Sequence, residues 1–119
     1  MHVLYGLGPG ESAIEALETA LDRAVAAGDE VTVAVYGDSA EREHLRDLAR
    51  DRLAEADVPG SVRELEDDPA GRLVALAEQE GFDRVVLPGG ERSPLGKIRL
   101  DSLTEFVLLN ATTTVTLIR

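Results

Sequence analysis

Short apolar runs alternate along the chain with longer stretches in which apolar residues recur every three or four positions. The short runs predict five β-strands, at residues 2–7, 31–36, 61–66, 84–88 and 114–119. The longer stretches predict four helices, which begin near Ser12, Asp38, Asp68 and Ser102. Because strands that alternate with helices form a parallel sheet, the pattern predicts one three-layer α/β domain over residues 1–119, with helices on both faces of a five-stranded parallel sheet.

Local signals mark the predicted helix starts. Three of them match the capping box, in which an N-cap side chain and an acid three residues later satisfy two backbone N–H groups: Ser12 with Glu15, Asp38 with Glu41, and Ser102 with Glu105. The remaining start places Asp68 before Pro69, which is favoured at the first helical position. The chain therefore specifies its helices locally as well as by periodicity.

The two outer strands are predicted from their composition. Residues 61–66 carry charges on both faces, which favours an edge position because charge deters pairing with other molecules. Residues 114–119 are β-branched and apolar with no charge before Arg119, so this strand offers a pairing surface if it lies at the other edge.

The charge balance narrows the choice of partners. The chain has 23 acids and 12 bases, a net charge of −11, which argues against general affinity for nucleic acid or anionic membranes. All the bases except Lys97 are arginine. An acid-rich and lysine-poor surface resembles proteins of salt-accumulating cytoplasms and predicts a halophilic source, with an ordinary acidic bacterial protein as the alternative.

Neither a metal site nor a catalytic pair is predicted. There is no cysteine, so disulfides, thiol nucleophiles and thiolate metal sites are excluded. His2 and His44 lie far apart in the chain without a matching carboxylate pattern, and no serine lies in a GxSxG elbow. The N-terminus lacks an export signal and no apolar run has the roughly 20 residues of a membrane span, so we expect a non-enzymatic, cytoplasmic protein.

Taken in this order, the chain resembles the universal stress protein family. The resemblance is most specific in "DDPAGRLVALAEQEGFDRVVLPGG" (67–90), "RSPLGKIRL" (92–100) and "SLTEFVLLNATTTVTLIR" (102–119). The family has an acid-Pro-Ala helix start, an "EEGADLIVMG" strand, an "RSG" loop, a "GSVTEKVL" helix and a final "PVLVVR" strand. The resemblance implies a flavodoxin-like (Rossmann-like) fold and a homodimer that pairs through the last strand, here 114–119.

The nucleotide motif of that family is degenerate in this chain. Its ATP-binding branch carries Gly, two residues, Gly, nine residues, Gly and then Ser or Thr. With the hydroxyl on Ser102, the three glycines fall on Pro88, Glu91 and Asp101, and the acid that ends the first strand falls on Gly8. Proline donates no N–H, and Asp101 would stand where the phosphates were expected. The resemblance therefore implies a family member without ATP binding.

Other features favour an anion site. Gly89 and Gly90 can supply backbone N–H groups, and residues 91–101 carry three bases against two acids. The "GLGPG" turn at 6–10 faces the same edge of the predicted sheet, although a tight turn explains either loop equally well. The candidate nucleotide or anion residues are Gly8, Gly10, Val35, Gly89, Gly90, Arg92, Ser93, Lys97 and Ser102.

Two functions follow from the sequence. The first is a non-catalytic module of the stress response that regulates or binds a partner protein, without a cofactor. The alternative is a sensor that binds ATP, AMP or another anion with the loop at 88–102. The sequence names neither the partner nor the stress.

Overall fold

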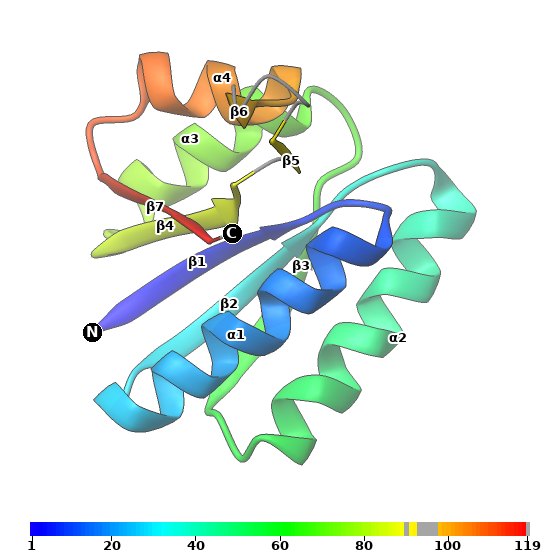
Figure 1. Cartoon of the computed structure of the whole chain (residues 1–119), viewed down its shortest axis with the longest axis vertical. Coiled ribbons are helices and arrows are strands. Elements are labelled where there is room, and N and C mark those ends of the chain that lie inside the picture. Colours follow the sequence, from blue (N-terminus) through cyan, green and yellow to red (C-terminus); the bar gives the residue numbers. More distant parts are fainter. Residues whose placement is uncertain (90, 93–97, 119) are drawn as a thin grey trace.

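The computed structural model describes residues 1–89, 91–92 and 98–118. Five strands form one parallel sheet in the order β3-β2-β1-β4-β7, and two further strands form a small antiparallel pair (Figure 1). In chain order the elements are β1 (His2–Leu7), α1 (Glu11–Ala27), β2 (Glu30–Val35), α2 (Ser39–Glu55), β3 (Gly60–Glu64), α3 (Pro69–Gln79), β4 (Arg84–Pro88), β5 (Glu91–Arg92), β6 (Ile98–Arg99), α4 (Ser102–Asn110) and β7 (Thr114–Ile118). The predicted fold class is confirmed.

The helices cover the sheet in pairs. Helices α1 and α2 lie on one face, and α3 and α4 lie on the other (Figure 1). Successive residues of β1 serve the two faces: Tyr5 and Leu7 belong to the core under α1 and α2, whereas Leu4 belongs to the core under α3 and α4. Because the central strands are apolar on both faces, their runs show no alternation of apolar and polar residues, as is typical of buried parallel strands.

The sheet has β3 at one edge, as the charges of residues 61–66 predict, and β7 at the other. Strand β3 is an edge strand, and its charged residue Arg63 forms an ion pair with Glu80 at 2.9 Å. Strand β7 lies at the opposite edge and pairs with β4 along its whole length, from Thr114 to Ile118. The pair β5–β6 was not predicted, since strands of two residues have no periodicity to detect.

Two of the four predicted helix caps are confirmed. The Asp38 carboxylate accepts from the Glu41 N–H at 2.8 Å while the Glu41 carboxylate accepts from the Asp38 N–H at 2.9 Å, which completes a capping box. Asp68 caps α3 through the Gly71 N–H at 3.3 Å, with Pro69 first in the helix.

The two serine caps were predicted wrongly. Helix α1 begins at Glu11 and its N-cap is Gly10, whose φ of 121° lets the chain turn into the helix two residues before the Ser12 capping box would start it. Helix α4 has Asp101 as its N-cap, so that Ser102 is already helical. In α4 the residue before the serine, Asp101, caps the helix through its carboxylate, whereas in α1 the N-cap lies two residues before the serine and makes no side-chain hydrogen bond.

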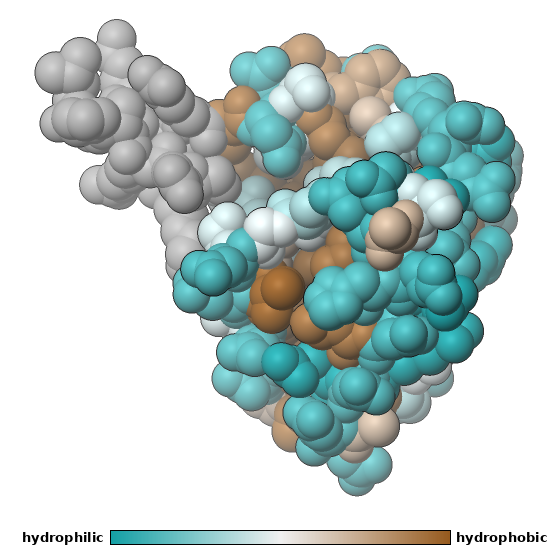
Figure 2. All heavy atoms as spheres, turned by 90° about the vertical axis from the view of Figure 1, so that its right-hand side faces the viewer, coloured by the Kyte–Doolittle hydropathy of each residue, from teal (hydrophilic) through white to brown (hydrophobic). Residues whose placement is uncertain are grey.

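The surface beside α2 is strongly hydrophilic. Figure 2 shows hydrophilic side chains over most of this face of the molecule. Arg46 and Arg52 of α2 form ion pairs with neighbouring acids, such as the contact of Arg52 with Glu18 of α1 at 3.3 Å. Throughout the described part of the chain, no helix combines the length and the apolar character that a membrane span requires.

The order of the strands identifies the edge at which a ligand would bind. The chain runs outward from β1 to β2 and β3, then returns to add β4 and β7 on the other side of β1. The carboxyl ends of β1 and β4 are therefore neighbours at the point where the strand order reverses. Ligands of open parallel sheets bind in the crevice at such a point, beyond the carboxyl ends of the strands.

Candidate functional site

Several candidate residues from the sequence gather at this carboxyl edge. Gly8 follows β1, Val35 ends β2, Gly89 follows β4 and Ser102 opens α4. We call the region that these residues border the crevice. Gly10 lies at its rim, where it opens α1. Gly90, Ser93 and Lys97 lie outside the described residues, and only the backbone of Arg92 is described, as part of β5.

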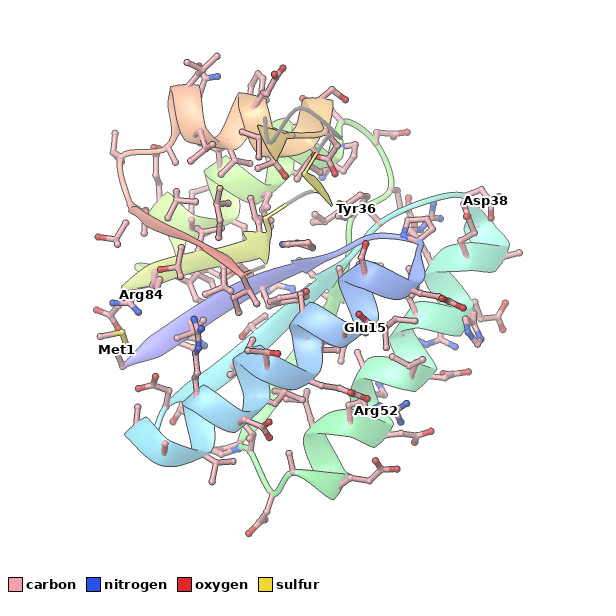
Figure 3. All side chains as sticks on the ribbon, in the orientation of Figure 1. Met1, Glu15, Tyr36, Asp38, Arg52 and Arg84 are labelled. Atoms are coloured by element: carbon pink, nitrogen blue, oxygen red, sulfur yellow. The ribbon has the colours of Figure 1, made fainter. Side chains whose placement is uncertain are left out.

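A residue that the sequence analysis did not select lies in the crevice. Tyr36 directly follows β2, and its position is labelled in Figure 3. The Tyr36 N–H donates to the Leu7 carbonyl at 3.1 Å, which continues the pairing of β1 with β2. A Cβ atom on Gly8 would lie 2.5 Å from Cζ of the Tyr36 ring and 2.7 Å from its hydroxyl oxygen. The ring therefore lies directly over the Gly8 backbone.

The register of β1 against β2 could have revealed this contact. Leu7 is opposite Val35, so the next residues along the two strands, Gly8 and Tyr36, are also neighbours. A glycine beside an aromatic residue on the adjacent strand is a pattern in which the ring covers the bare backbone. From the sequence, Gly8 was selected as a candidate nucleotide residue and as part of a glycine-rich turn, but not as the partner of Tyr36.

Burial dominates the electrostatics of both tyrosines. Burial of the phenol raises the pKa of Tyr36 to about 12, and the negative charge of Asp101 adds to this effect. The pKa of Tyr5 is also raised, mainly by burial, and its hydroxyl donates to the Ala13 carbonyl at 2.7 Å. Both rings therefore remain neutral at physiological pH, and among the described residues the charge that acts on Tyr36 is the carboxylate of Asp101.

Among the described residues, the groups on the β4 and α4 sides of the crevice are already engaged or cannot donate to a phosphate. The Gly89 N–H, predicted to bind an anion, donates to the Ile118 carbonyl at 2.6 Å. Pro88 has no N–H to donate. At the start of α4 the Asp101 carboxylate accepts from the Thr104 N–H at 2.7 Å, so a negative side chain already occupies the helix terminus.

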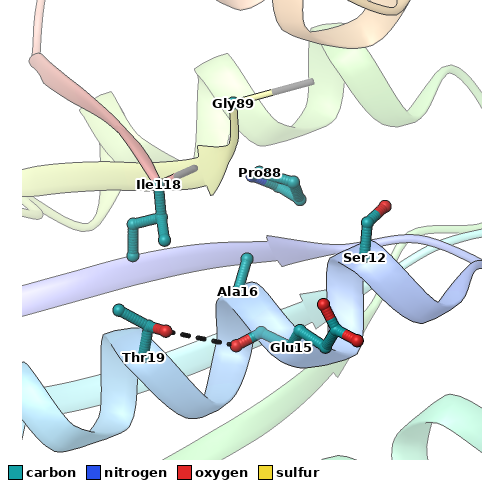
Figure 4. Close-up of a pocket in the computed structure, with 7 residues that line it drawn as sticks. All are labelled: Ser12, Glu15, Ala16, Thr19, Pro88, Gly89 and Ile118. Carbon is teal, nitrogen blue, oxygen red and sulfur yellow. Dashed lines mark hydrogen bonds between the residues drawn. The ribbon is translucent and has the colours of Figure 1, made fainter. Parts of the chain in front are cut away.

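A separate cavity lies on the α1 side of the sheet. Figure 4 shows it between α1 and the ends of β4 and β7, with a volume of about 190 Å³. The residues that line it are Ser12, Glu15, Ala16, Thr19, Pro88, Gly89 and Ile118. Its one charged lining residue is Glu15, so the cavity does not suit an anion. The cavity and the crevice therefore adjoin at Gly89, whereas Gly8, Val35 and Ser102 are not among the described lining residues of the cavity.

The histidines have structural surroundings. The His2 ring stacks on Phe82 with ring centroids 4.2 Å apart, and its Nε2 lies 3.0 Å from the Thr32 hydroxyl. His2 is thus half-buried, because β1 carries it against the loop that precedes β4. His44 is exposed on α2. The described ranges contain no group of three or more side chains that could together hold a metal ion.

The strand order and the helices on both faces define a flavodoxin-like α/β protein, in which the crevice lies where the strand order reverses. The family model of the universal stress proteins matches residues 1–119. The chain therefore belongs to the universal stress protein family.

Solved structures of other family members share the fold. A universal stress protein from Archaeoglobus fulgidus is 21% identical with a TM-score of 0.83, and the match covers 100% of this chain and 98% of that one. A universal stress protein in complex with cAMP is 22% identical with a TM-score of 0.81, covering 100% and 96%. The Archaeoglobus fulgidus protein in complex with dAMP is 19% identical with a TM-score of 0.79, covering 100% and 98%. No curated protein matches the chain.

Replacing Asp101 tests which residue caps α4. We expect Asp101→Ala to lower the free energy of unfolding by about 1 kcal/mol, because the Thr104 N–H loses its acceptor. Asp101→Asn keeps an acceptor and should cost much less, and Ser102→Ala should leave stability nearly unchanged. Urea unfolding measures all three. If Ser102→Ala costs as much as Asp101→Ala, then Ser102 is the cap.

The buried tyrosines predict a loss of stability in alkali. The Tyr36 phenol loses its proton near pH 10 in the unfolded chain and at about 12 in the native chain. Between these values the native state binds more protons, so stability is complete below pH 10 and falls as the pH rises through this window. Tyrosinate absorbance of the folded protein should stay low at pH 11. Tyr36→Phe should flatten the pH dependence of unfolding, and tyrosinate that is half developed near pH 10 in folded protein would contradict the burial.

Proposed function

We propose that this protein is a non-catalytic member of the universal stress protein family that acts by regulation or by binding a partner protein, with a crevice that does not hold a nucleoside triphosphate. One observation carries the proposal. The Gly89 N–H is committed to the Ile118 carbonyl, and the carboxylate of Asp101 occupies the N-terminus of α4. A triphosphate could therefore bind at neither position without displacing the partner that is already there.

Electrostatics supports the same conclusion. Two unit negative charges about 4 Å apart repel by about 4 kcal/mol at an effective dielectric constant of 20. A phosphate placed at the start of α4 would meet the Asp101 carboxylate at such a distance, in a chain whose net charge is −11. The aspartate already compensates the positive end of the helix dipole, so the dipole adds little attraction for a phosphate.

The absence of catalysis is proposed on the chemistry of the described residues. Within these residues the hydrogen-bonding partner of the half-buried His2 ring is Thr32, whose hydroxyl lies within the sheet, and His44 is exposed on α2. Neither imidazole is positioned to activate a nucleophile in the crevice. A regulatory role requires no such pair.

The rival function is a sensor of a smaller nucleotide. Relatives have been solved in complexes with cAMP and dAMP, which carry one phosphate. One phosphate needs fewer donors than three, and the loop at 88–102 contains Arg92 and Lys97. Binding of AMP through this loop is therefore the alternative, and the ligand experiment below separates the two.

We further propose that two copies pair through β7. This strand has β4 as its neighbour on one side, and the described residues Thr114–Ile118 contain no charge that would deter pairing on the other. Beside it, α4 exposes 84% of Leu109 and 41% of Leu108. A second copy related by a two-fold axis would supply an identical strand and a matching apolar surface.

Nucleotide titration tests the proposed function. We expect the melting temperature to stay constant with ATP, ADP, AMP or cAMP, with and without magnesium, because the Gly89 N–H is engaged and the Asp101 carboxylate opposes a phosphate. A ligand at 100 times its dissociation constant would stabilise the protein by about 2.7 kcal/mol, which is readily detected. A rise of several degrees that Arg92→Ala combined with Lys97→Ala abolishes would contradict the proposal and establish the sensor.

Light scattering tests the dimer. At micromolar concentration we expect twice the chain mass of 12.7 kDa. Thr116→Lys should favour the monomer, since it places a charge at the centre of the paired strand of each subunit. Thr112→Lys makes the same change outside β7 and should leave the dimer intact. A wild-type mass equal to one chain would refute the pairing.

A further inference from the structure

We propose that Tyr36 is an internal occupant of the crevice: its ring fills the space over Gly8 and so decides whether a flat aromatic ligand can enter. The inference deepens the proposed function and rests on it for the class of ligand, which is a nucleobase or a similar heterocycle. The packing on which it is built, that of Tyr36 on Gly8, does not depend on that function.

The position of the ring is the first step. Tyr36 leaves the sheet at the carboxyl end of β2, and its ring reaches over the end of β1, the strand beside which the order reverses. The ring packs against the core on the side of α3 and α4. The negative charge of Asp101, at the start of α4, acts on the phenol and raises its pKa further. A ligand at this edge would need the same space.

The second step concerns Gly8. Gly8 does not have a positive φ, unlike Gly10 and Gly37. Its backbone conformation would therefore accept a side chain. A side chain is excluded by lack of space, because a Cβ at residue 8 would overlap the Tyr36 ring. Gly10 differs: no atom lies within 4 Å of its Cβ position, and its φ of 121° alone accounts for glycine. Gly8 and Tyr36 are thus a matched pair.

The third step is that the ring can move. The atoms nearest to Gly8 are at the tip of the side chain, namely Cζ, Cε2 and the hydroxyl oxygen. Rotation about χ1 would carry this tip away from Gly8 while the Tyr36 N–H keeps its bond to Leu7. Tyr36 is only partly buried, so the ring has solvent on one side. An open crevice therefore differs from the closed one by a side-chain rotation.

The same geometry indicates the class of ligand. The Tyr36 ring is flat and lies over bare backbone, so a planar group could replace it in the same position. Stacking of bases with aromatic or flat surfaces tolerates different bases, because every base has a π-face. The adenine nucleotides bound by relatives contain such a group. Competition between the phenol and a base would keep the crevice empty of nucleotide.

A double-mutant cycle tests the packing. Gly8→Ala should lower the melting temperature of the wild type by at least about 4 °C, since the new methyl group displaces or strains the ring. In the Tyr36→Ala background the same change should cost less than half as much. Gly10→Ala is the matched control, because its cost arises from backbone conformation and should be equal in both backgrounds. Equal costs of Gly8→Ala in both backgrounds would overturn the proposal.

Titration with AMP tests the occupancy. Millimolar AMP should raise the melting temperature of Tyr36→Ala by several degrees and leave the wild type unchanged. Tyr5→Phe is the control for general destabilisation, because it removes a buried hydrogen bond without opening the crevice. Tyr36→Val replaces Tyr36→Ala if the latter does not fold.

The possible failures are distinguishable. No response of either Tyr36 variant to AMP overturns the claim that the ring decides occupancy. If the wild type binds AMP as tightly as the variants, the proposed function fails together with that claim. If the wild type binds AMP but the variants bind it at least tenfold more tightly, the proposed function fails while the role of Tyr36 stands.

Discussion

The pairing of β1 with strands on both of its sides is the constraint on which the rest of the structure depends. Leu4, Tyr5 and Leu7 are completely buried, so β1 contributes to the core on both faces of the sheet. Its register with β2 brings residue 8 beside residue 36, and its place beside β4 sets the reversal of strand order. The position of the crevice and the residue that fills it both follow from these two pairings.

The crevice combines the backbone geometry of a ligand site with two described polar groups that are already paired. Neighbouring carboxyl ends, a helix terminus and a glycine after β4 are all in the places that a ligand site requires. The polar groups have been satisfied from within: Asp101 caps α4, and Gly89 donates to the last strand. A buried donor that already has a partner gains little from a ligand, because binding would exchange one hydrogen bond for another.

Periodicity and capping residues predicted most of the fold. Five parallel strands, four helices and the edge position of β3 were predicted correctly, because the apolar runs and the charges of residues 61–66 are local properties. The serine caps failed because Gly10 and Asp101, one or two residues earlier, start the helices sooner. At the site, Gly8, Val35, Gly89 and Ser102 were placed at the correct edge, whereas the part played by Tyr36 was missed.

The sequence by itself determined the order of elements, the acidic composition and the presence of Pro88, Glu91 and Asp101 between the fourth strand and the last helix, since each is written in residue types along the chain. Only the tertiary structure decided which contacts the residues around the crevice make. The Tyr36 ring packs on Gly8 because β1 and β2 are aligned in register. The Gly89 N–H donates to the carbonyl of Ile118, a residue far away in the sequence. Such contacts depend on distances between strands, which no local pattern encodes.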